Sequence, residues 1–502
     1  EEVTRRGRQA IVLVPEISLT PQTRHRFRAR FAHVAVLHSG LSDSERNWHW
    51  QRIARGEVQV VVGARSAIFA PTPSLGLVVL DEEHDGSFKQ DSQPRYQARD
   101  VALWRTRDEY VPLVLGSATP ALETWQRARN GEFRLVEMPR RVSGFPLPEV
   151  TTIDLRSERR EGGWRGSVSR PLADSIRQAL AAGGQVILLL NRRGFATSIQ
   201  CPGCGYVARC PDCDLALTHH KKDERAICHY CDYEIPAPNA CPQCQFAGIR
   251  LAGLGTEKLE DEVAQRFPGV PLLRMDSDTM SKPGSHEAAL DRFRSGEVRL
   301  LIGTQMIAKG LDFPQVTLVG VVNADTALHF PDFRASERTF QLVTQVAGRT
   351  GRGRLGGHVV VQTYNPEHPA IVAAQKHDYA KFAEGELPQR IDLGFPPFGM
   401  LVRIIVRGES ALLTQGYAEQ VAGRLEKAIA DAGPNASGGS YGRVLGPAPC
   451  PLAKLRGKFR FHVLAQSGDG DWLRRVVREA TRGVDLPRGV QWLVDVDPVD
   501  ML

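Results

Sequence analysis

The sequence predicts an α/β protein made of two parallel-sheet lobes, with a cysteine-rich insert in the second lobe and a small α+β domain at the carboxyl end. Three observations predict this architecture. Short apolar runs alternate with helical patterns, as in parallel sheets. Eight of the nine cysteines lie between Cys201 and Cys244. Residues 386–502 read strand, helix, strand, helix, strand, which is the order of a compact α+β sandwich.

The composition is that of an ordinary globular protein. The 502 residues are 42% hydrophobic and 24% charged, and the length suggests about three domains. The net charge of +7 is compatible with a polyanionic partner. No apolar run approaches the roughly 20 residues that span a bilayer. The cysteine clustering favours metal binding in a reducing compartment over disulfide bonds.

The first lobe is expected to span residues 1–137. Apolar runs predict strands at 9–14, 34–37, 58–62, 77–80 and 113–116, and the segments between them predict a basic helix at 22–30 and a helix containing Trp48 and Trp50. Ligands bind at the carboxyl ends of such parallel strands, so the loops there are the candidate site.

An acidic motif, Asp81-Glu-Glu-His84, follows the strand at 77–80. Asp81 at a strand tip can hold Mg²⁺ through water, and Glu82 can polarise an attacking water, as nucleotide hydrolysis requires. The alternative is a solvated acidic turn. The later turn Gly116-Ser-Ala-Thr-Pro120 carries hydroxyls that can bond the acidic loop.

The loop after the acidic motif interleaves aromatic and basic residues. Phe88 and Tyr96 alternate with Lys89, Arg95 and Arg99. Aromatic rings can stack on bases while cations meet phosphates, so this loop is a candidate nucleic-acid contact. The alternative is a surface loop held in place by two aromatics.

The second lobe is expected at 138–196 and 249–385, with strands at 151–155, 185–190, 250–253, 271–275, 299–302, 317–322 and 358–363 and a helix at 257–267. After the strand at 299–302, Gly303, Thr304 and Gln305 can meet a nucleic-acid backbone. Asp312 can reach a ribose hydroxyl. The alternative is an ordinary strand-to-helix loop.

The segment Gln345-Val-Ala-Gly-Arg-Thr-Gly-Arg352 is the sharpest signal in the chain. Arg349 and Arg352 are three residues apart and therefore lie on one helical face. Their guanidinium groups can fork onto a γ-phosphate, where charge spreads in the transition state. A chance basic loop is the alternative.

The insert at 197–248 contains four Cys-x-x-Cys pairs. Two pairs complete one tetrahedral Cys₄ site, so four pairs predict two structural zinc ions, and the sequence leaves three pairings open. Iron–sulfur binding is the competing interpretation. His219, His220 and His229 are not needed as ligands and are expected at the surface, and Cys450 is expected to be an isolated structural thiol. The pairs are Cys201 and Cys204, Cys210 and Cys213, Cys228 and Cys231, and Cys241 and Cys244.

The last segment, 386–502, predicts strands at 401–407, 459–465 and 491–496 and helices at 411–431 and 471–482, in an order that suggests a ferredoxin-like sandwich. Residues 454–460 form a basic hairpin candidate for DNA. A solvated charge run is the alternative.

These motifs, in this order, are similar to the core of superfamily-two helicases, in which ATP lies between two RecA-like lobes. Further segments resemble the PriA family of bacterial primosomal replication-restart helicases (primosomal protein N′), and the resemblance covers essentially every residue. The cysteine insert is its most specific part. The other segments are Val14 to Gln22, Leu37 to Arg46, Asp81 to Asp85, Leu190 to Ala196 and Leu493 to Pro498.

The resemblance implies an ATP-dependent 3′→5′ DNA helicase that recognises stalled or branched forks and helps reload the replicative helicase. Its cofactors would be ATP, Mg²⁺ and two Zn²⁺. It implies zinc pairing of the first cysteine pair with the fourth and the second with the third. The implied site residues are Asp81, Glu82, Arg349 and Arg352 for catalysis; Glu83, His84, Gly310, Asp312 and Gln345 for the nucleotide; and Phe88, Lys89, Arg95, Tyr96, Thr304 and Gln305 for DNA.

The implied partners are forked DNA, single-strand-binding protein, other primosome proteins and the helicase loader, in a bacterial cytoplasm at the nucleoid. A non-catalytic DNA-binding primosome scaffold is the rival function, and an RNA helicase or other translocase with a zinc insert is a third. The family's phosphate loop and N-terminal DNA-binding domains are not among these residues. We expect truncation of an active helicase, and we expect that the 502 residues alone do not hydrolyse ATP.

Overall fold

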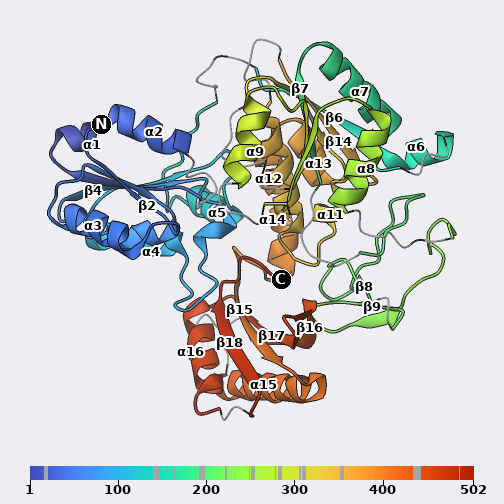
Figure 1. The fold of residues 1–502 in the computed structure, drawn as a ribbon. Coiled ribbons are helices and arrows are strands. Elements are labelled where there is room, and N and C mark those ends of the chain that lie inside the picture. The colour runs from blue at the N-terminus through green and yellow to red at the C-terminus, as the bar shows by residue number, and fades with distance from the viewer. Residues whose placement is uncertain are drawn as a thin grey trace. The chain divides into compact units, whose positions relative to one another are not determined.

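The computed structural model describes residues 1–15, 21–139, 144, 146–162, 166–190, 198–220, 223–247, 249, 255–276, 279–280, 285–304, 307, 313–350, 356–433, 442–484 and 487–501. The chain forms two compact units (Figure 1). Unit 1 contains residues 1–134, and unit 2 contains the described residues from Leu135 onward. Within the described residues, no helix has the length and apolar character needed to cross a membrane.

Unit 1 is a parallel five-stranded sheet in the order β2-β3-β1-β4-β5. Helices lie on both faces of this sheet (Figure 1). The central strands are apolar and buried along most of their length, as expected for a sheet covered on both sides. The strands are β1 Gln9–Leu13, β2 Val34–Leu37, β3 Val60–Gly63, β4 Leu75–Asp81 and β5 Leu113–Gly116, so all five predicted strands are confirmed.

Among the α-helices of unit 1, α3 begins at a side-chain cap. Helix α3 starts with a complete capping box, in which Ser42 accepts from the Glu45 backbone and Glu45 accepts from the Ser42 backbone. Trp48 and Trp50 lie on this helix as predicted. The helices are α1 Glu2–Arg5, α2 Pro21–Arg30, α3 Asp43–Ala54, α4 Ala98–Asp108 and α5 Leu122–Arg129, with short 3₁₀ helices at Arg65–Phe69 and Gly86–Phe88.

Unit 2 contains a second parallel sheet, in the order β11-β12-β7-β13-β14-β6. The predicted strand at 250–253 lies outside the described residues; the other predicted strands of this lobe are confirmed. The strands are β6 Glu149–Asp154, β7 Gln185–Leu189, β11 Leu272–Met275, β12 Leu300–Gly303, β13 Val316–Val321 and β14 His358–Thr363. The helices are α6 Leu155–Gly162, α7 Arg170–Ala181, α8 Thr256–Arg266, α9 Ser285–Arg294, α11 Asp325–Leu328, α12 Ala335–Ala347, α13 Pro369–Gln375 and α14 Tyr379–Asp392.

The cysteine-rich insert of unit 2 has little regular structure apart from a small antiparallel sheet. Its strands are β8 Thr218–His220, β9 Arg225–Ile227 and β10 Glu234–Pro236. Among the described residues, the buried apolar side chains of the insert form one cluster with Phe333 of the lobe and with Leu401, Leu464 and Met501 of the C-terminal domain. These three parts of unit 2 therefore pack as neighbours.

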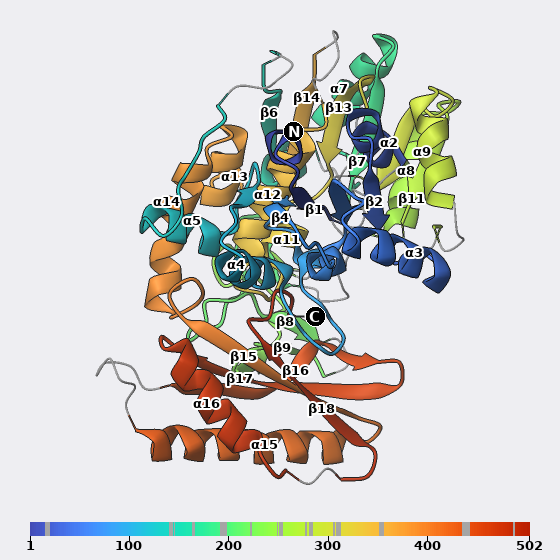
Figure 2. The same cartoon turned by 90° about the vertical axis from the view of Figure 1, so that its left-hand side faces the viewer.

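The C-terminal domain is a four-stranded antiparallel sheet in the order β16-β17-β15-β18. Helices α15 and α16 pack together on one face of it (Figure 2). The chain order β-α-β-β-α-β with this strand order confirms the ferredoxin-like expectation. The elements are β15 Met400–Gly408, α15 Ala411–Ala432, β16 Arg443–Leu455, β17 Lys458–Ser467, α16 Gly470–Thr481 and β18 Val490–Val496.

Candidate functional site

The acidic motif lies at the carboxyl end of β4, at the edge where a parallel sheet binds ligands. Asp81 is exposed at the strand tip, and its Oδ1 accepts a bond of 3.2 Å from the Glu82 amide. Glu82 has a φ of 50°, a left-handed conformation that costs a non-glycine residue about 1–2 kcal/mol. Backbone bonds from Glu83 N to Gly116 O and from Asp85 N to Glu82 O hold this turn. Such local strain is frequent at functional sites.

Glu83 is the buried anchor of the motif, with only 1% of its surface exposed. Its carboxylate accepts from Ala121 N at 2.7 Å, from Thr124 Oγ1 at 2.9 Å and from Arg99 Nη1 at 3.2 Å. Burial raises the pKa of Glu83, and Arg99 opposes that shift. These contacts fix the acidic loop to the start of α5, and the Glu83 carboxylate accepts all three bonds from groups of the protein itself.

His84 joins the acidic loop to the hydroxyl-bearing turn after β5. Its Nδ1 lies 2.7 Å from Ser117 Oγ and 3.7 Å from Glu82 Oε2. Ser117 Oγ also accepts a bond of 2.9 Å from Thr119 N. The predicted bond between these two loops is therefore confirmed, and it is made by His84 and Ser117.

The loop after the acidic motif differs from the prediction. Phe88 is fully buried in the core of unit 1, because the 3₁₀ turn that Asp85 caps directs the ring inward. Lys89 is also buried, and Arg99 pairs with Glu83. The prediction that Phe88 stacks on bases, and that Lys89 and Arg99 meet phosphates, therefore does not agree with this structure. Tyr96 is half-buried.

Arg65, which the sequence did not single out as a site residue, fixes this loop from the 3₁₀ helix that follows β3. Its Nε donates to Gln90 Oε1 at 2.8 Å, and its Nη1 donates to the carbonyls of Ser87 and Lys89 at 2.9 and 3.2 Å. The sequence feature that could have indicated this role is the Gly63-Ala-Arg-Ser66 loop directly after β3. Tyr96 packs edge-on against Phe69 with ring centroids 5.0 Å apart. Arg95 is half-buried and, with Tyr96, remains a candidate DNA contact.

The motifs of the second lobe lie at the ends of β12 and α12. Thr304 is half-buried directly after β12, and Gln345 and Arg349 are half-buried at and just after the carboxyl end of α12. Thr350 Oγ1 donates to Val316 O at 2.9 Å, which fixes the turn containing Arg349 to the sheet. The predicted residues Gln305, Gly310, Asp312 and Arg352 lie outside the described residues.

The eight clustered cysteines form two groups of four. One group joins the first and fourth pairs, and the other joins the second and third pairs, so the nested pairing is confirmed. Within each group the sulfur atoms lie within 4.8 Å of one another. Three Sγ–Sγ distances are 3.6, 3.6 and 3.5 Å. Four thiolates bonded to zinc at about 2.3 Å in a tetrahedron lie roughly 3.8 Å apart, so both groups fit zinc.

Two of the insert's histidines are not at the surface, in contrast to the prediction. His229 is 1% exposed, and its Nδ1 lies 2.7 Å from Pro449 O of the C-terminal domain; His219 is also buried. No local sequence pattern indicates this packing, because it joins residues 220 positions apart. Cys450 is buried as expected, but it is not isolated, since Arg403 Nη2 donates to its sulfur at 3.5 Å.

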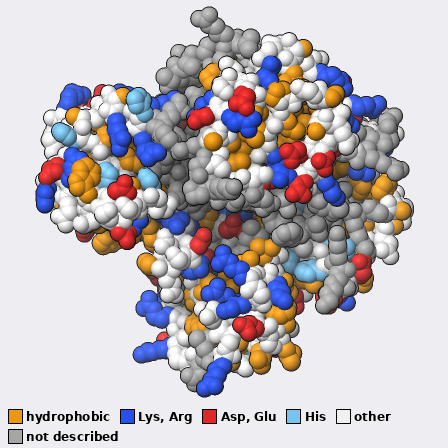
Figure 3. All heavy atoms as spheres, in the orientation of Figure 1, with side chains coloured by type: hydrophobic (Ala, Val, Ile, Leu, Met, Phe, Trp, Pro, Cys, Tyr) orange, Lys and Arg blue, Asp and Glu red, His pale blue; other side chains and the backbone are white. Residues whose placement is uncertain are grey.

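The predicted basic hairpin is confirmed as the turn between β16 and β17. Arg456 and Gly457 have φ angles of 50° and 80°, the left-handed pair that a tight two-residue hairpin requires. Lys454 Nζ lies 4.7 Å from the centroid of the Phe459 ring. Figure 3 shows that Lys and Arg side chains gather on the C-terminal domain, in the lower part of the view. This domain therefore offers a cationic surface.

Four family models match successive parts of the chain. A DEAD/DEAH box helicase model matches residues 1–128, and a helicase conserved C-terminal domain model matches residues 251–354. A model of the Cys-rich region of the PriA DNA helicase matches residues 210–236. A model of the primosomal protein N C-terminal domain matches residues 392–499.

Curated relatives align with nearly the whole chain. Replication restart protein PriA of Bacillus subtilis is 43% identical over 507 aligned residues, which cover 100% of this chain and 62% of that protein. The Synechocystis protein of the same name is 42% identical, with 99% and 59% covered, and that of Treponema pallidum is 42% identical, with 100% and 74% covered. The chain thus spans about three fifths of the length of the first two relatives.

Among solved structures, RecG bound to a three-way DNA junction aligns with a TM-score of 0.42 and 17% identity, over 76% of this chain and 40% of that one. The identity to the PriA relatives, together with the matches to the two PriA-specific domains, decides the family. The chain belongs to the PriA family of replication restart helicases.

Proposed function

We propose that this chain is the motor and C-terminal part of an ATP-dependent DNA helicase that moves 3′→5′ on forked DNA and starts replication restart. The observation that carries the proposal is that the side chains of the acidic motif lie in different surroundings. Glu83 and His84 are occupied by the protein's own loops, while Asp81 stays exposed at the strand tip. Because the Asp81 carboxylate is exposed at the strand tip, a metal ion can approach it from solvent, and Glu82 is the next residue in the chain.

In this proposal the nucleotide chemistry is shared between the two lobes. Asp81 would hold Mg²⁺ through water, and the ion would neutralise phosphate charge. Glu82, oriented by His84, polarises the attacking water. Arg349 and Arg352 stabilise the charge that develops on the γ-phosphate, and Gly310, Asp312 and Gln345 bind the nucleotide. Ser117 relays the state of the acidic loop to the hydroxyl turn.

Nucleic acid in this proposal contacts both lobes and the C-terminal domain. Arg95, Tyr96, Thr304 and Gln305 are the lobe candidates, and the hairpin between β16 and β17 supplies cations for phosphates. The two Cys₄ groups hold zinc and keep the insert folded. Single-strand-binding protein, primosome proteins and a helicase loader are the proposed protein partners.

A strand-displacement assay tests the activity. The complete reading frame is incubated with ATP and duplexes that carry a single-stranded tail on either the 3′ or the 5′ side. The proposal predicts displacement only from the substrate that permits 3′→5′ movement, and loss of displacement in Glu82→Gln with fork binding retained. Tight fork binding with no displacement on any substrate would instead support the non-catalytic scaffold.

A further inference from the structure

Three parts of unit 2 each contribute one ring to a single buried aromatic cluster, which we call the joint. Tyr230 comes from the cysteine insert, Phe333 from the segment before α12, and Phe395 from the loop that leads into the C-terminal domain. Phe333 and Phe395 stack with centroids 4.8 Å apart and planes 13° apart, and Tyr230 meets Phe395 edge-on at 6.0 Å. The Phe333 amide donates to the Tyr230 hydroxyl at 3.4 Å. All three residues are buried.

Arg390 of α14 bonds across this joint with one guanidinium group. Its Nη2 donates to Glu337 Oε2 of α12 at 2.9 Å, and its Nη1 donates to Pro396 O of the loop at 3.2 Å. Its Nε donates to Glu386 Oε1 of its own helix at 3.1 Å, and its Cζ lies 5.1 Å from the centroid of the Phe333 ring. The side chain is 2% exposed, so solvent hardly screens these interactions.

The end of the C-terminal domain binds the same end of α12. Arg334 Nη1 donates to Pro498 O at 3.0 Å, and Arg338 donates to Val499 O. Arg338 Nη1 also pairs with Asp332 Oδ2 at 2.9 Å. The first turn of α12 is therefore held by the insert, by α14 and by the last residues of the C-terminal domain.

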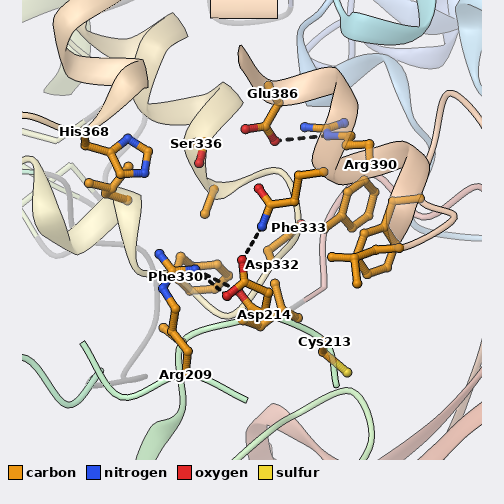
Figure 4. A pocket seen from close by; sticks show the side chains of 17 residues that line it. Arg209, Cys213, Asp214, Phe330, Asp332, Phe333, Ser336, His368, Glu386 and Arg390 are labelled. Carbon is orange, nitrogen blue, oxygen red and sulfur yellow. Dashed lines mark hydrogen bonds and ion pairs between the residues drawn. The ribbon is translucent and has the colours of Figure 1, made fainter. Parts of the chain in front are cut away.

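A cavity of about 190 Å³ lies beside the joint, and Figure 4 shows the side chains that line it. Arg209 and Asp214 of the insert line one side of it, and Ser336 of α12 and Glu386 of α14 line another. Close packing thus does not continue across this part of the interface. The directional bonds of Arg390 and the aromatic stack consequently fix the first turn of α12.

The opposite end of α12 leads to the arginine motif. At 1.5 Å per helical residue, the end of α12 at Ala347 lies about 15 Å along the helix axis from Glu337, and Arg349 follows two residues later. The helix between them is buried through Phe340, Val343 and Val346, and Thr350 is bonded to the sheet. A packed helix moves as a rigid element, so a tilt at Glu337 displaces the turn that carries Arg349.

We propose that Arg390 is a positioning residue: it clamps α12 to the joint and thereby lets the cysteine insert and the C-terminal domain set the placement of Arg349. This inference rests on the proposed function, because Arg349 has a role in turnover only if the chain hydrolyses ATP. Zinc binding would affect the joint by way of Tyr230, because Tyr230 precedes the zinc ligand Cys231 in the chain and its hydroxyl accepts the bond from the Phe333 amide.

Steady-state ATPase kinetics of Arg390→Met in the complete reading frame give the first test. We expect kcat with forked DNA to fall about tenfold, while the KM for ATP stays within about twofold, as for a lost transition-state contact. Arg390→Lys keeps the charge between Glu337 and Glu386 but cannot fork to Pro396 O, so it restores stability without restoring kcat. The control Arg424→Met removes bonds to Ala480 O and Arg482 O inside the C-terminal domain and should leave kcat unchanged.

Hydrogen exchange gives a second test that does not depend on ATPase activity. In Arg390→Met, amide exchange should rise together in α12, in the knuckle at 228–231 and at the start of β15; in Arg424→Met it should rise only in α15 and α16. Removing zinc from the wild-type protein should also raise exchange in the first turn of α12. If Arg390→Met fails to fold, Phe395→Leu removes the stacked ring while keeping an apolar side chain, and the same exchange pattern is expected.

Exchange that rises only in α14, or an unchanged kcat in a folded Arg390→Met protein, would overturn the clamp. If the wild-type protein shows no DNA-dependent ATPase, the proposed function fails, and the exchange pattern still decides whether Arg390 holds α12.

Discussion

Replacing Glu83 by alanine should destabilise unit 1 by removing the acceptor that ties the acidic loop to α5. Breaking a buried ion pair by deleting one partner costs about 3–5 kcal/mol, because the other charge is left uncompensated. Arg99 would keep its bond of 3.1 Å to Thr124 Oγ1, and its side chain is 16% exposed. We therefore expect the lower end of that range, about 3 kcal/mol.

Native-state hydrogen exchange of the full chain measures this loss. Since each 1.4 kcal/mol is a factor of ten, amides of β4 and β5 should exchange on the order of 100-fold faster in Glu83→Ala. Glu83→Gln keeps an acceptor for Ala121 N and should lose less. The double variant Glu83→Ala with Arg99→Met removes both charges and should recover most of the protection. A double variant as unstable as Glu83→Ala would refute the reasoning from an unpaired charge.

Three further predictions concern unit 2. Metal analysis should return two equivalents of zinc per chain; one equivalent, or iron with visible absorbance, would contradict the two Cys₄ sites. Arg349→Ala or Arg352→Ala should lower ATP turnover roughly 10³-fold with little change in ATP affinity, and loss of affinity alone would show that these arginines bind the ground state. Burial lowers the pKa of His368 in the folded protein to about 4. Between pH 6.5 and 4 the imidazole is therefore protonated in the unfolded chain but mostly neutral in the folded one, so the stability should fall as the pH drops from about 6.5 to 4. His368→Asn keeps an acceptor for the Ala370 amide and should make that pH-dependent loss shallower in denaturation curves, and an unchanged curve would contradict this role.

The strands of both lobes could be predicted from the sequence because buried parallel strands are continuous apolar runs bounded by turns. Strand β16 was missed, since Pro447, Pro449 and Pro451 contradict a strand pattern; they are tolerated at the sheet edge, where β16 pairs only with β17 among the described strands. Cysteine spacing alone left the zinc pairing open. Each Cys-x-x-Cys pair is a local feature of the sequence, whereas the fold determines which two pairs come together around one ion.

The residue types of the candidate site could be predicted from the sequence, but the directions in which their side chains point could not. Composition showed an aromatic and basic loop after the acidic motif, but only the 3₁₀ turn after Asp85 shows that Phe88 packs inward. Likewise, the sequence identified four residues, Asp81 to His84, as one site. The structure separates Glu83, which is saturated by internal bonds, from the exposed Asp81.

DNA-dependent ATP hydrolysis by the complete reading frame tests the central claim most directly. No Gly-Lys-Ser or Gly-Lys-Thr, the end of the phosphate-loop pattern, occurs in the 502 residues. We predict that the complete protein hydrolyses ATP when forked DNA is added, that Glu82→Gln abolishes this turnover, and that the 502-residue chain alone shows none. A complete protein that contains the phosphate loop, binds forked DNA and shows no DNA-dependent hydrolysis would contradict the helicase function and leave the scaffold in its place.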